Sequence, residues 1–452
     1  MRKVDVVVIG GGASGLQAAI TTKSTYPEKE VVLIRKEAQV LIPCGIPYIF
    51  GTLSDSSKDI MPDKLLTNAG VEIIIDEITD IAVEARSCIT ASGETYKYEK
   101  LILALGSKPT LPGWLKGAKL ENVFTIPKDK IYLDDMLIKL GTAKRIVVIG
   151  AGFIGVEVSD ELNKKDYKVT LVEIEKTILS RAFDEEFGKI AEEHLLERGL
   201  NLITGKGVSE IKGKNGKVNQ VVLSSGETID ADAVILSMGY APNTKIAEKA
   251  GIALNEFGFI RTCEYMRVLP CSTDIIAVGD CAQKRDFITR KVDRTMLAST
   301  ACAEARTGGM NLYTLSPCKP FTGTIAIYST AIGQHAFGTA GITETKAIQE
   351  NFAIISGSFS GADTHPGNLT HSHKQTVKLI VAADCGMILG GEVYGGVSTG
   401  ELTNSIGFLI QNRVTVKELL TMQIGTQPLL TGSPAGYPLI KAAEVIVNKM
   451  RK

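Results

Sequence analysis

The stretch Val4-Asp5-Val6-Val7-Val8-Ile9-Gly10-Gly11-Gly12-Ala13-Ser14-Gly15 decides the fold of this chain. Its first half is a β-branched run of the kind that forms a buried parallel strand, and residues 16–25 after it have a helical pattern. A Gly-x-Gly-x-x-Gly pattern between a strand and a helix allows a tight turn and the close approach of a pyrophosphate group, which lies at the helix N-terminus. The sequence therefore predicts a dinucleotide site that includes Gly10, Gly12, Ala13, Ser14 and Gly15.

The next strand, at residues 31–34, is followed by an arginine where dinucleotide sites usually carry an acid for the ribose hydroxyls. Arg35 lies 35 − 15 = 20 residues after Gly15, and Glu37 is displaced from that position by two. We therefore expect Arg35 to belong to the first nucleotide site, where it grips the adenosine half in an unusual way. The alternative is a solvated surface charge.

A second Gly-x-Gly-x-x-Gly pattern lies between the strand at residues 145–149 and another helix. The strand at 169–172 then ends at Glu173, 173 − 155 = 18 residues after the last glycine of the pattern. A carboxylate at this position accepts hydrogen bonds from both ribose hydroxyls and repels a 2′-phosphate, which favours NADH over NADPH. The residues expected to bind this second dinucleotide are Gly150, Gly152, Phe153, Ile154, Gly155, Glu157 and Glu173.

Between the two patterns lies Leu41-Ile42-Pro43-Cys44-Gly45-Ile46-Pro47-Tyr48. Pro43 fixes the backbone before the sulfur, and Gly45 lets another group approach closely. If the residues from Tyr48 onward are helical, the helix dipole favours a thiolate at Cys44. A lone cysteine is usually a small buried residue, but a position behind a cofactor motif favours a redox role. We therefore predict that Cys44 is catalytic.

Two other strand ends have features of a cofactor site. The apolar strand at residues 96–103 ends in the small-residue turn that contains Ala104 and Gly106, which suits a backbone that passes close to a cofactor. The strand at 274–278 ends in Gly279-Asp280, and a carboxylate there can hold a polyol chain.

The composition excludes several classes of protein. Fifty basic and fifty acidic residues cancel, which argues against a nucleic-acid binder. Eight cysteines show no paired scaffold spacing, so we expect a cytoplasmic protein in a reducing compartment. The first residues do not have the pattern of a signal peptide, and no run of eighteen apolar residues predicts a membrane span.

In chain order, these segments resemble the pyridine nucleotide-disulfide oxidoreductases, also called two-dinucleotide-binding-domain flavoproteins, over essentially the whole sequence. The resemblance implies FAD at the first pattern, at Ala104 and Gly106 and, through its ribityl chain, at Asp280. It implies NADH at the second pattern and a further match at Gly239. Leu105 replaces the threonine of the family's Ala-Thr-Gly turn.

The resemblance also implies the fold. We expect an α/β protein with two Rossmann-like domains, for FAD and NAD, and a C-terminal α+β domain that forms a homodimer and completes the active site across the two-fold axis. The expected boundaries are residues 1–112 with 246–320 for the FAD-binding domain, 113–245 for the NAD-binding domain and 321–452 for the dimerisation domain.

The segment around Cys44 is similar to the single-cysteine branch of the family, which contains coenzyme A disulfide reductases, persulfide and polysulfide reductases, and NADH oxidases and peroxidases. Ile49 stands where two-cysteine members have their second cysteine, so Cys44 is expected to cycle through a mixed disulfide, persulfide or sulfenic acid. The leading hypothesis is an enzyme in which NADH reduces FAD and FAD reduces a small sulfur acceptor through Cys44. The alternatives are an NADH oxidase that reduces O2 at the flavin and an electron-transfer reductase for a small redox protein.

Three segments depart from what the resemblance implies. Thr21-Thr22-Lys23 replaces the arginines on the first helix of coenzyme A disulfide reductases, and His365-Pro366-Gly367 replaces a Tyr-Pro-Gly segment. Gln427 occupies the position of the acid/base histidine of disulfide reductases and cannot titrate. We consider His365 as the proton donor, expect His371 and His373 in a surface loop, and expect no metal site.

The other cysteines that we considered are expected to be buried small residues, with Cys302 near the flavin. They are Cys263, Cys271, Cys281, Cys302, Cys318 and Cys385.

Overall fold

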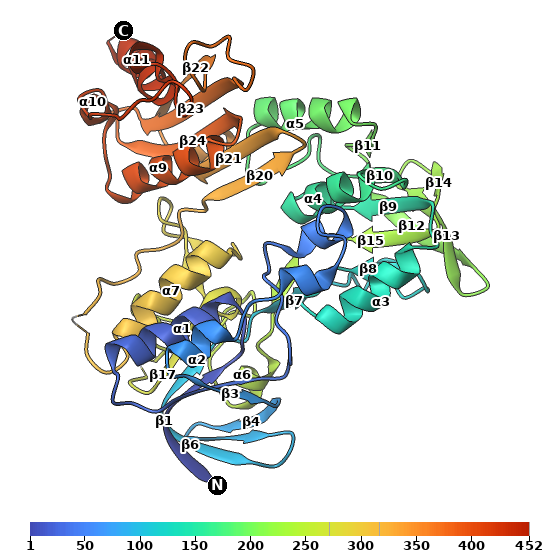
Figure 1. Cartoon of the computed structure of the whole chain (residues 1–452), viewed down its shortest axis with the longest axis vertical. Helices are drawn as coiled ribbons and strands as arrows, with labels where there is room; N and C mark the ends of the chain where they lie inside the picture. Colours follow the sequence, from blue (N-terminus) through green and yellow to red (C-terminus); the bar gives the residue numbers. More distant parts are fainter. Residues whose placement is uncertain (271, 316, 452) are drawn as a thin grey trace.

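Two mainly parallel sheets and one antiparallel sheet organise the chain (Figure 1). The computed structural model describes residues 1–270, 272–315 and 317–451, so that Cys271 lies outside the described residues. Within these ranges, no helix has the length and apolar character that crossing a membrane requires.

The first sheet contains the first glycine pattern and has the order β3-β2-β1-β6-β5-β4, with β17 paired to β6. Strand β1 pairs in parallel with β2 and β6, because its β-branched side chains are buried on both faces. A strand from residues 275–277 thus joins a sheet that is otherwise built from the first 103 residues. The strands are β1 (Arg2–Ile9), β2 (Val31–Arg35), β3 (Glu72–Ile75), β4 (Ile78–Ala82), β5 (Ser87–Thr90), β6 (Thr95–Leu103) and β17 (Ile275–Ala277).

Helices α1 and α7 pack against each other over this sheet (Figure 1). The helical elements of this part are α1 (Ala13–Thr25), η1 (Ile46–Phe50), η2 (Ser56–Asp59), α2 (Lys64–Asn68), α6 (Lys245–Lys249), η3 (Gly279–Cys281) and α7 (Ala298–Met310). Two short ribbons accompany them. Strand β7 (Ser107–Pro109) pairs with β16 (Tyr240–Pro242) where the chain passes between the two parallel sheets, and β18 (Lys284–Arg285) pairs with β19 (Val292–Asp293).

The second sheet is parallel throughout and contains the second glycine pattern. Its order is β11-β10-β9-β15-β8. The strands are β8 (Val123–Thr125), β9 (Arg145–Ile149), β10 (Lys168–Val172), β11 (Asn201–Ile203) and β15 (Ala233–Leu236), and the helices are α3 (Lys130–Leu140), α4 (Phe153–Asn163) and α5 (Glu185–Glu197). A small antiparallel sheet beside it contains β12 (Val208–Lys214), β13 (Lys217–Leu223) and β14 (Thr228–Asp230).

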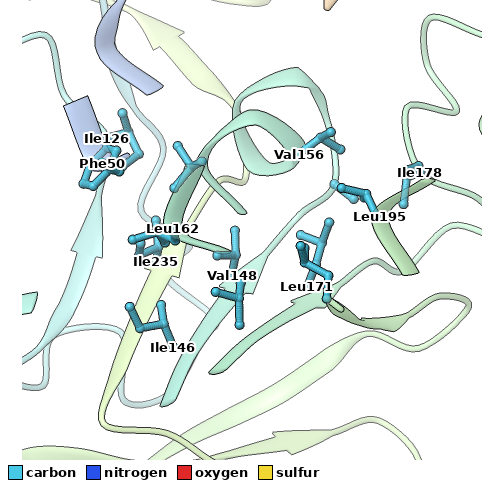
Figure 2. Packing of buried hydrophobic residues seen from close by; sticks show 14 of the residues in the cluster. Phe50, Ile126, Ile146, Val148, Val156, Leu162, Leu171, Ile178, Leu195 and Ile235 are labelled. Atoms are coloured by element: carbon cyan, nitrogen blue, oxygen red, sulfur yellow. The ribbon is translucent and has the colours of Figure 1, made fainter. Parts of the chain in front are cut away.

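The core of this second unit extends to the helix that follows Cys44. Val148 of β9 and Ile235 of β15 pack with Val156 of α4, and Phe50 of η1 belongs to the same cluster (Figure 2). Ile49, at the position of the second cysteine of two-cysteine relatives, is fully buried there. The Thr52 N–H also donates to the Glu161 carboxylate of α4, at 2.5 Å. Helix η1 is thereby anchored to the helix of the second glycine pattern.

The C-terminal sheet is antiparallel, with the order β20-β21-β24-β23-β22, and α9 and α11 cover it. The strands are β20 (Tyr328–Ile332), β21 (His335–Gly341), β22 (Ile354–Ala362), β23 (Lys374–Ala382) and β24 (Ile388–Gly395). The helical elements are α8 (Glu344–Gln349), α9 (Thr399–Gln411), α10 (Val416–Leu419), η4 (Pro434–Gly436) and α11 (Pro438–Met450). The predicted fold class, with two Rossmann-like units and a C-terminal α+β unit, is confirmed.

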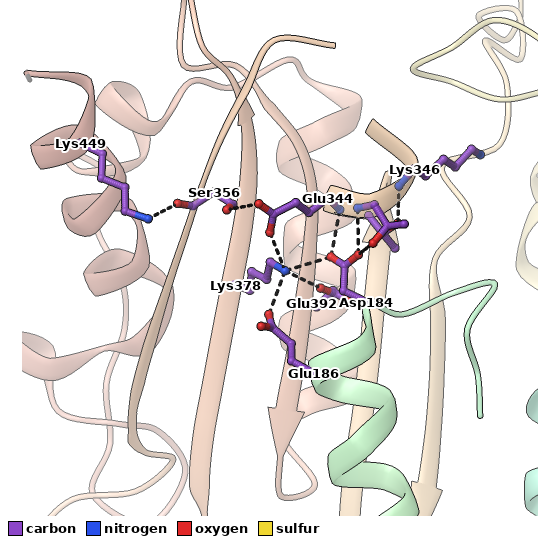
Figure 3. Close-up of polar contacts among 10 residues, drawn as sticks. Asp184, Glu186, Glu344, Lys346, Ser356, Lys378, Glu392 and Lys449 are labelled. Carbon is purple, nitrogen blue, oxygen red and sulfur yellow. Dashed lines mark hydrogen bonds and ion pairs between the residues drawn. The ribbon is translucent and has the colours of Figure 1, made fainter. Parts of the chain in front are cut away.

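A buried lysine joins the C-terminal sheet to the start of α5 (Figure 3). Lys378 Nζ on β23 lies 3.0 Å from Asp184, 2.8 Å from Glu186 and 2.8 Å from Glu344. Glu392 of β24 is fully buried 3.7 Å from the same nitrogen. Lys378 and Asp184 are both charged and buried, so each needs the opposite charge of the other to offset the cost of burial.

Candidate active site

The first glycine loop folds tightly and leaves one side open. A Cβ on Gly10 would clash with the Ala104 carbonyl oxygen, and a Cβ on Gly15 would clash with the carbonyl oxygen of Gly10. A Cβ on Gly12, by contrast, would meet nothing within 4 Å. The loop is therefore closed against β6 and open at the N-terminus of α1, where a pyrophosphate group can approach.

The other residues predicted for FAD lie around this loop. Gly279 is so close to Ser14 that a Cβ would clash with the Ser14 hydroxyl, and Asp280 follows directly. The Asp280 carboxylate accepts hydrogen bonds from Ser107 Oγ at 2.7 Å and from Lys128 Nζ at 2.6 Å. Burial alone would raise the pKa of Asp280, but the Lys128 ammonium holds it below its usual value. Gly106 has a positive φ of 68° and open space beside it. This arrangement fits a dinucleotide with a polyol chain.

Arg35 is not a solvated charge, so that alternative is wrong. Its side chain packs against Gly11, and the residue is only 4% exposed. The guanidinium donates to both carboxylate oxygens of Asp63 at 2.7 Å and to the carbonyl oxygens of Glu37 and Ala38. Arg35 thus lies at the first loop with most of its donors used by the protein, and its contact with adenosine remains a prediction.

The second glycine loop repeats the design of the first. A Cβ on Gly155 would clash with the Gly150 carbonyl oxygen, whereas Gly152 has open space. The Glu173 carboxylate accepts hydrogen bonds from the N–H groups of Ala151, at 2.6 Å, and Glu175, at 2.9 Å. Its position at the loop is the one expected for a ribose contact. Phe153 stacks on Tyr328 at 4.8 Å between ring centroids, Ile154 packs against the core beside it, and Gly239 has a positive φ with open space.

Cys44 lies in a turn where groups from both parallel-sheet units meet. Its side chain is exposed, and η1 begins two residues later, at Ile46. The predicted helix is therefore present, but it does not lower the pKa of the thiol. Desolvation by the surrounding protein raises the pKa of Cys44, the charge of Glu157 raises it further, and Lys128 opposes them. Cys302 of α7 also acts on this thiol, and its place near the flavin remains a prediction.

Glu157 links the second loop to Cys44 and to the C-terminal unit. It lies on α4, and burial raises its pKa to about 7. Its carboxylate accepts a hydrogen bond from Thr330 of β20 at 2.8 Å. A group that can gain or lose a proton near neutral pH therefore lies between the second nucleotide loop and the exposed thiol.

His365 lies beside the Gln427 turn, so the structure brings two of the departures together. The His365 N–H donates to the Pro428 carbonyl, and Nδ1 lies 2.9 Å from the Thr431 carbonyl oxygen. A carbonyl can only accept, so Nδ1 carries the hydrogen and Nε2 is left as an acceptor. In the part of the chain that the structure describes, His365 has no hydrogen bond with the Cys44 turn.

His371 and His373 lie in the loop before β23, as expected; His371 is exposed, and the half-buried ring of His373 lies 3.5 Å from the Asp363 carboxylate and against the ring of His335. The expectation that Cys385 is buried is wrong. Cys385 is exposed in the turn between β23 and β24, while Cys281 is buried and Cys263, Cys302 and Cys318 are half-buried. Among the described residues, no group of three or more His, Cys, Asp and Glu side chains is arranged to hold a metal ion.

Sequence reasoning missed two residues at the site, Lys128 and Asp59. Lys128 lies in the connection before α3, and Asp59 ends η2, and neither belongs to a motif or a periodic pattern. The structure brings both of their charges to Cys44.

The two glycine loops define a protein that binds two dinucleotides, and the exposed Cys44 thiol lies near Glu157 of the helix after the second loop and near Cys302. The family profile described as pyridine nucleotide-disulphide oxidoreductase matches residues 4–305, and the profile for the dimerisation domain of that family matches residues 327–435. The chain belongs to the pyridine nucleotide-disulphide oxidoreductase family and is an FAD-dependent NAD(P)H oxidoreductase.

Relatives of similar length have two kinds of names. The chain is 28% identical to an NADH oxidase of Methanocaldococcus jannaschii, over 98% of this chain and 99% of the relative. It is also 28% identical to an NAD(P)H coenzyme A polysulfide/persulfide reductase of Pyrococcus horikoshii, over 98% of each chain. The structure of an NAD-dependent persulfide reductase from A. fulgidus matches with a TM-score of 0.90 at 26% identity, over 99% of this chain and 84% of that one.

Proposed function

We propose that this oxidoreductase transfers electrons from NADH through FAD to a small sulfur acceptor, with Cys44 as the redox-active thiol. The observation that carries the proposal is the exposed Cys44 side chain next to Glu157 of the second loop's helix and Cys302 of α7. A thiol in this position can be reached both by an acceptor and from the two nucleotide loops. The names of the persulfide reductases similar to this chain agree with such a role.

Each predicted site residue has a task in this proposal. The loop at Gly10 to Gly15, with Arg35, Ala104, Gly106 and Asp280, holds FAD, and the loop at Gly150 to Gly155, with Glu157, Glu173 and Gly239, holds NADH. When bound, FAD supplies the two-electron relay between NADH and sulfur. Cys44 attacks the sulfur–sulfur bond of the acceptor and forms a mixed disulfide while one thiol leaves. Two electrons and two protons then restore the Cys44 thiol and release the second thiol.

The surface of α1 favours a persulfide or polysulfide over coenzyme A disulfide. Thr21 and Thr22 are buried, and Lys23 Nζ donates to the carbonyls of Pro27 and Lys29. This helix therefore presents no free cation for the phosphate groups of coenzyme A. Small acceptors, which lack such phosphates, do not need one.

An NADH oxidase is the second candidate. It is favoured by the relative of that name, which is as similar to this chain as the polysulfide/persulfide reductase is. Oxygen would then be reduced at the flavin, and Cys44 would tune the outcome. An electron-transfer reductase is less favoured, because it gives Cys44 no task.

We further propose a cytoplasmic homodimer whose C-terminal domain, residues 321–452, forms the contact. The match to a dimerisation profile supports this assembly. Residues 1–112 and 246–320 would together form the FAD-binding domain, which agrees with the pairing of β17 with β6. Residues 113–245 would form the NAD-binding domain. His365, as a proton donor, would then act on Cys44 of the partner subunit.

Stopped-flow reoxidation tests the proposed acceptor. Enzyme reduced with one equivalent of NADH is mixed with a persulfide, a polysulfide, coenzyme A disulfide or oxygen, and the return of the oxidised flavin spectrum is followed. Persulfide or polysulfide is expected to reoxidise the enzyme much faster than oxygen does. Oxygen as the fastest acceptor would instead establish the oxidase.

A further inference from the structure

Asp59, at the end of η2, has a buried carboxylate without a hydrogen-bond partner among the described residues. The residue is 3% exposed, and its Oδ2 has no hydrogen bond within the described part of the chain. Leaving a buried polar group unsatisfied costs stability, and a charged one costs more. An apolar residue at this position would stabilise the fold more, so the presence of a carboxyl group here suggests a role other than stability.

The backbone fixes Asp59 against the turn that carries Cys44. The Ile42 N–H donates to the Asp59 carbonyl oxygen at 2.9 Å, and Leu41 forms an antiparallel bridge with Ile60. Gly45, the residue after Cys44, is so close that a Cβ on it would clash with Asp59 Oδ1. The carboxyl group thus packs directly on the turn, and its charge acts on the Cys44 thiol.

The proposed chemistry needs a proton-handling group at this place. Gln427 cannot titrate, and His365, proposed above to act from the partner subunit, has no hydrogen bond with the Cys44 turn of its own chain in the part that the structure describes. Glu157 lies on α4, and its carboxylate accepts a hydrogen bond from Thr330. Asp59 has no such competing partner among the residues described.

We propose that Asp59 is an acid/base residue for Cys44, whose carboxylate receives the proton of the thiol and returns it to the departing sulfur; this rests on the function proposed above. With an acceptor R–S–S–R′, a Cys44–S–S–R bond forms, the S–S bond of the acceptor breaks, and R′–S⁻ leaves with the electron pair. The Cys44 proton passes to the Asp59 carboxylate and then to R′–S⁻, which departs as R′–SH. The exchange consumes no reductant, and NADH later supplies the electrons that open the mixed disulfide.

The electrostatic surroundings agree with this task. Burial raises the pKa of Asp59 to about 6, so that the group is ionised at pH 7 yet readily protonated. The elements packed around η2 are η1 and α3, and their titratable groups are Tyr48 of η1 and Lys130, Tyr132, Asp134, Asp135 and Lys139 of α3. Lys130 pairs with Asp134, which also accepts from Ser56, so this pair is internally neutral. Lys58, beside Asp59 in the chain, donates to the Leu53 carbonyl.

The experiment compares the Asp59→Asn holoenzyme with the parent and with Asp55→Asn, an exposed aspartate of the same segment that caps η2. Turnover with a persulfide is measured from pH 5 to 9, and alkylation of Cys44 by iodoacetamide is followed by mass spectrometry. In the parent, kcat/KM should fall below about pH 6. In Asp59→Asn, turnover at pH 7 should fall by about 10²-fold, because the departing sulfur receives no proton, and the acid limb should vanish.

Cys44 alkylation gives a second, independent readout. Removal of the Asp59 charge lowers the pKa of the neighbouring thiol, so alkylation at pH 7 should be faster in Asp59→Asn even though turnover is slower. A purely structural role cannot produce these opposite changes. Asp55→Asn should match the parent in both assays. Should Asp59→Asn lose FAD, Asp59→Glu replaces it and is expected to keep an acid limb at a shifted pH.

An unchanged pH profile in Asp59→Asn, with sulfur turnover still abolished by Cys44→Ser, would overturn the role of Asp59 and leave the proposed function intact. Sulfur turnover that survives Cys44→Ser would instead overturn the proposed function itself.

Discussion

Single residues at the two nucleotide loops are determined by local backbone geometry. Gly10, Gly15, Gly150 and Gly155 lack space for a side chain, and a short sequence pattern is enough to predict them. Glu173 could be predicted for the same reason, because the end of the second strand of such a unit always lies beside the loop. These residues needed no knowledge of the tertiary structure.

Glu173 leads to the first prediction, on nicotinamide choice. The parent enzyme should prefer NADH, since the carboxylate would face a 2′-phosphate and like charges in contact cost about 1 kcal/mol or more. Glu173→Ala should reduce the preference for NADH over NADPH by about fivefold or more, measured as the ratio of kcat/KM for the two nucleotides. Glu175→Ala is the control, because only the backbone N–H of this exposed residue contacts the site. Equal use of both nucleotides by the parent would refute the assignment.

Other residues could not be predicted from a pattern. The charges of Asp59 and Lys128 act on Cys44, but the two residues lie in separate segments, at the end of η2 and before α3. Only the tertiary structure brings these segments close to Cys44. The expectation for Cys385 failed because the residue falls in a tight turn between two strands.

At the level of elements, the sequence predicted a helix after Cys44, and the structure has the short helix η1 there. The helix was expected to lower the pKa of the Cys44 thiol through its dipole, and this expectation is wrong, because the pKa is raised. The helix is only five residues long, and its apolar side packs into the core of the second unit through Ile46, Ile49 and Phe50. Burial and the nearby Glu157 therefore dominate the pKa of Cys44 rather than the helix dipole.

The contact between β23 and α5 gives the second prediction. Lys378→Met leaves Glu392 and Asp184 buried without their cation, which typically costs about 3–5 kcal/mol. We expect a clearly lower Tm in calorimetry. Lys441→Met removes a partly exposed pair with Glu444 on α11 and should change stability by less than about 1 kcal/mol. Similar Tm values for both variants would show that the buried network contributes little.

The pH dependence of stability follows from the same contact. Burial alone would raise the pKa of Asp184, but hydrogen bonds from Thr345 and Lys378 hold it at about 2, below its ordinary 3.8. A lowered pKa means that the ionised group stabilises the fold above about pH 4 and that this contribution is lost as the pH falls towards 2. The stability gap between the parent and Lys378→Met should therefore shrink in that range.

At the scale of the whole molecule, the fold class could be predicted because each of the two Rossmann-like units contains a Gly-x-Gly-x-x-Gly pattern between a strand and a helix. The C-terminal unit carries no nucleotide motif, and only its alternating strands indicated its class. Large apolar side chains are exposed on it, as a surface for assembly requires. They include Val397, Phe408, Met422, Leu429 and Leu430.

We therefore predict a homodimer in sedimentation at micromolar concentration. Dilution that yields monomers should also reduce turnover with sulfur acceptors, since His365 of the partner subunit would be lost from the site. A stable monomer with full activity would contradict the proposed assembly.

The measurement that tests the central claim most directly is turnover of the Cys44→Ser holoenzyme with persulfide. Serine preserves the shape of the turn and FAD binding but removes the nucleophile. Flavin reduction by NADH should continue, slow oxygen consumption should remain, and persulfide turnover should fall by orders of magnitude. Persulfide turnover at the parent rate would contradict the account and make Cys44 a structural residue.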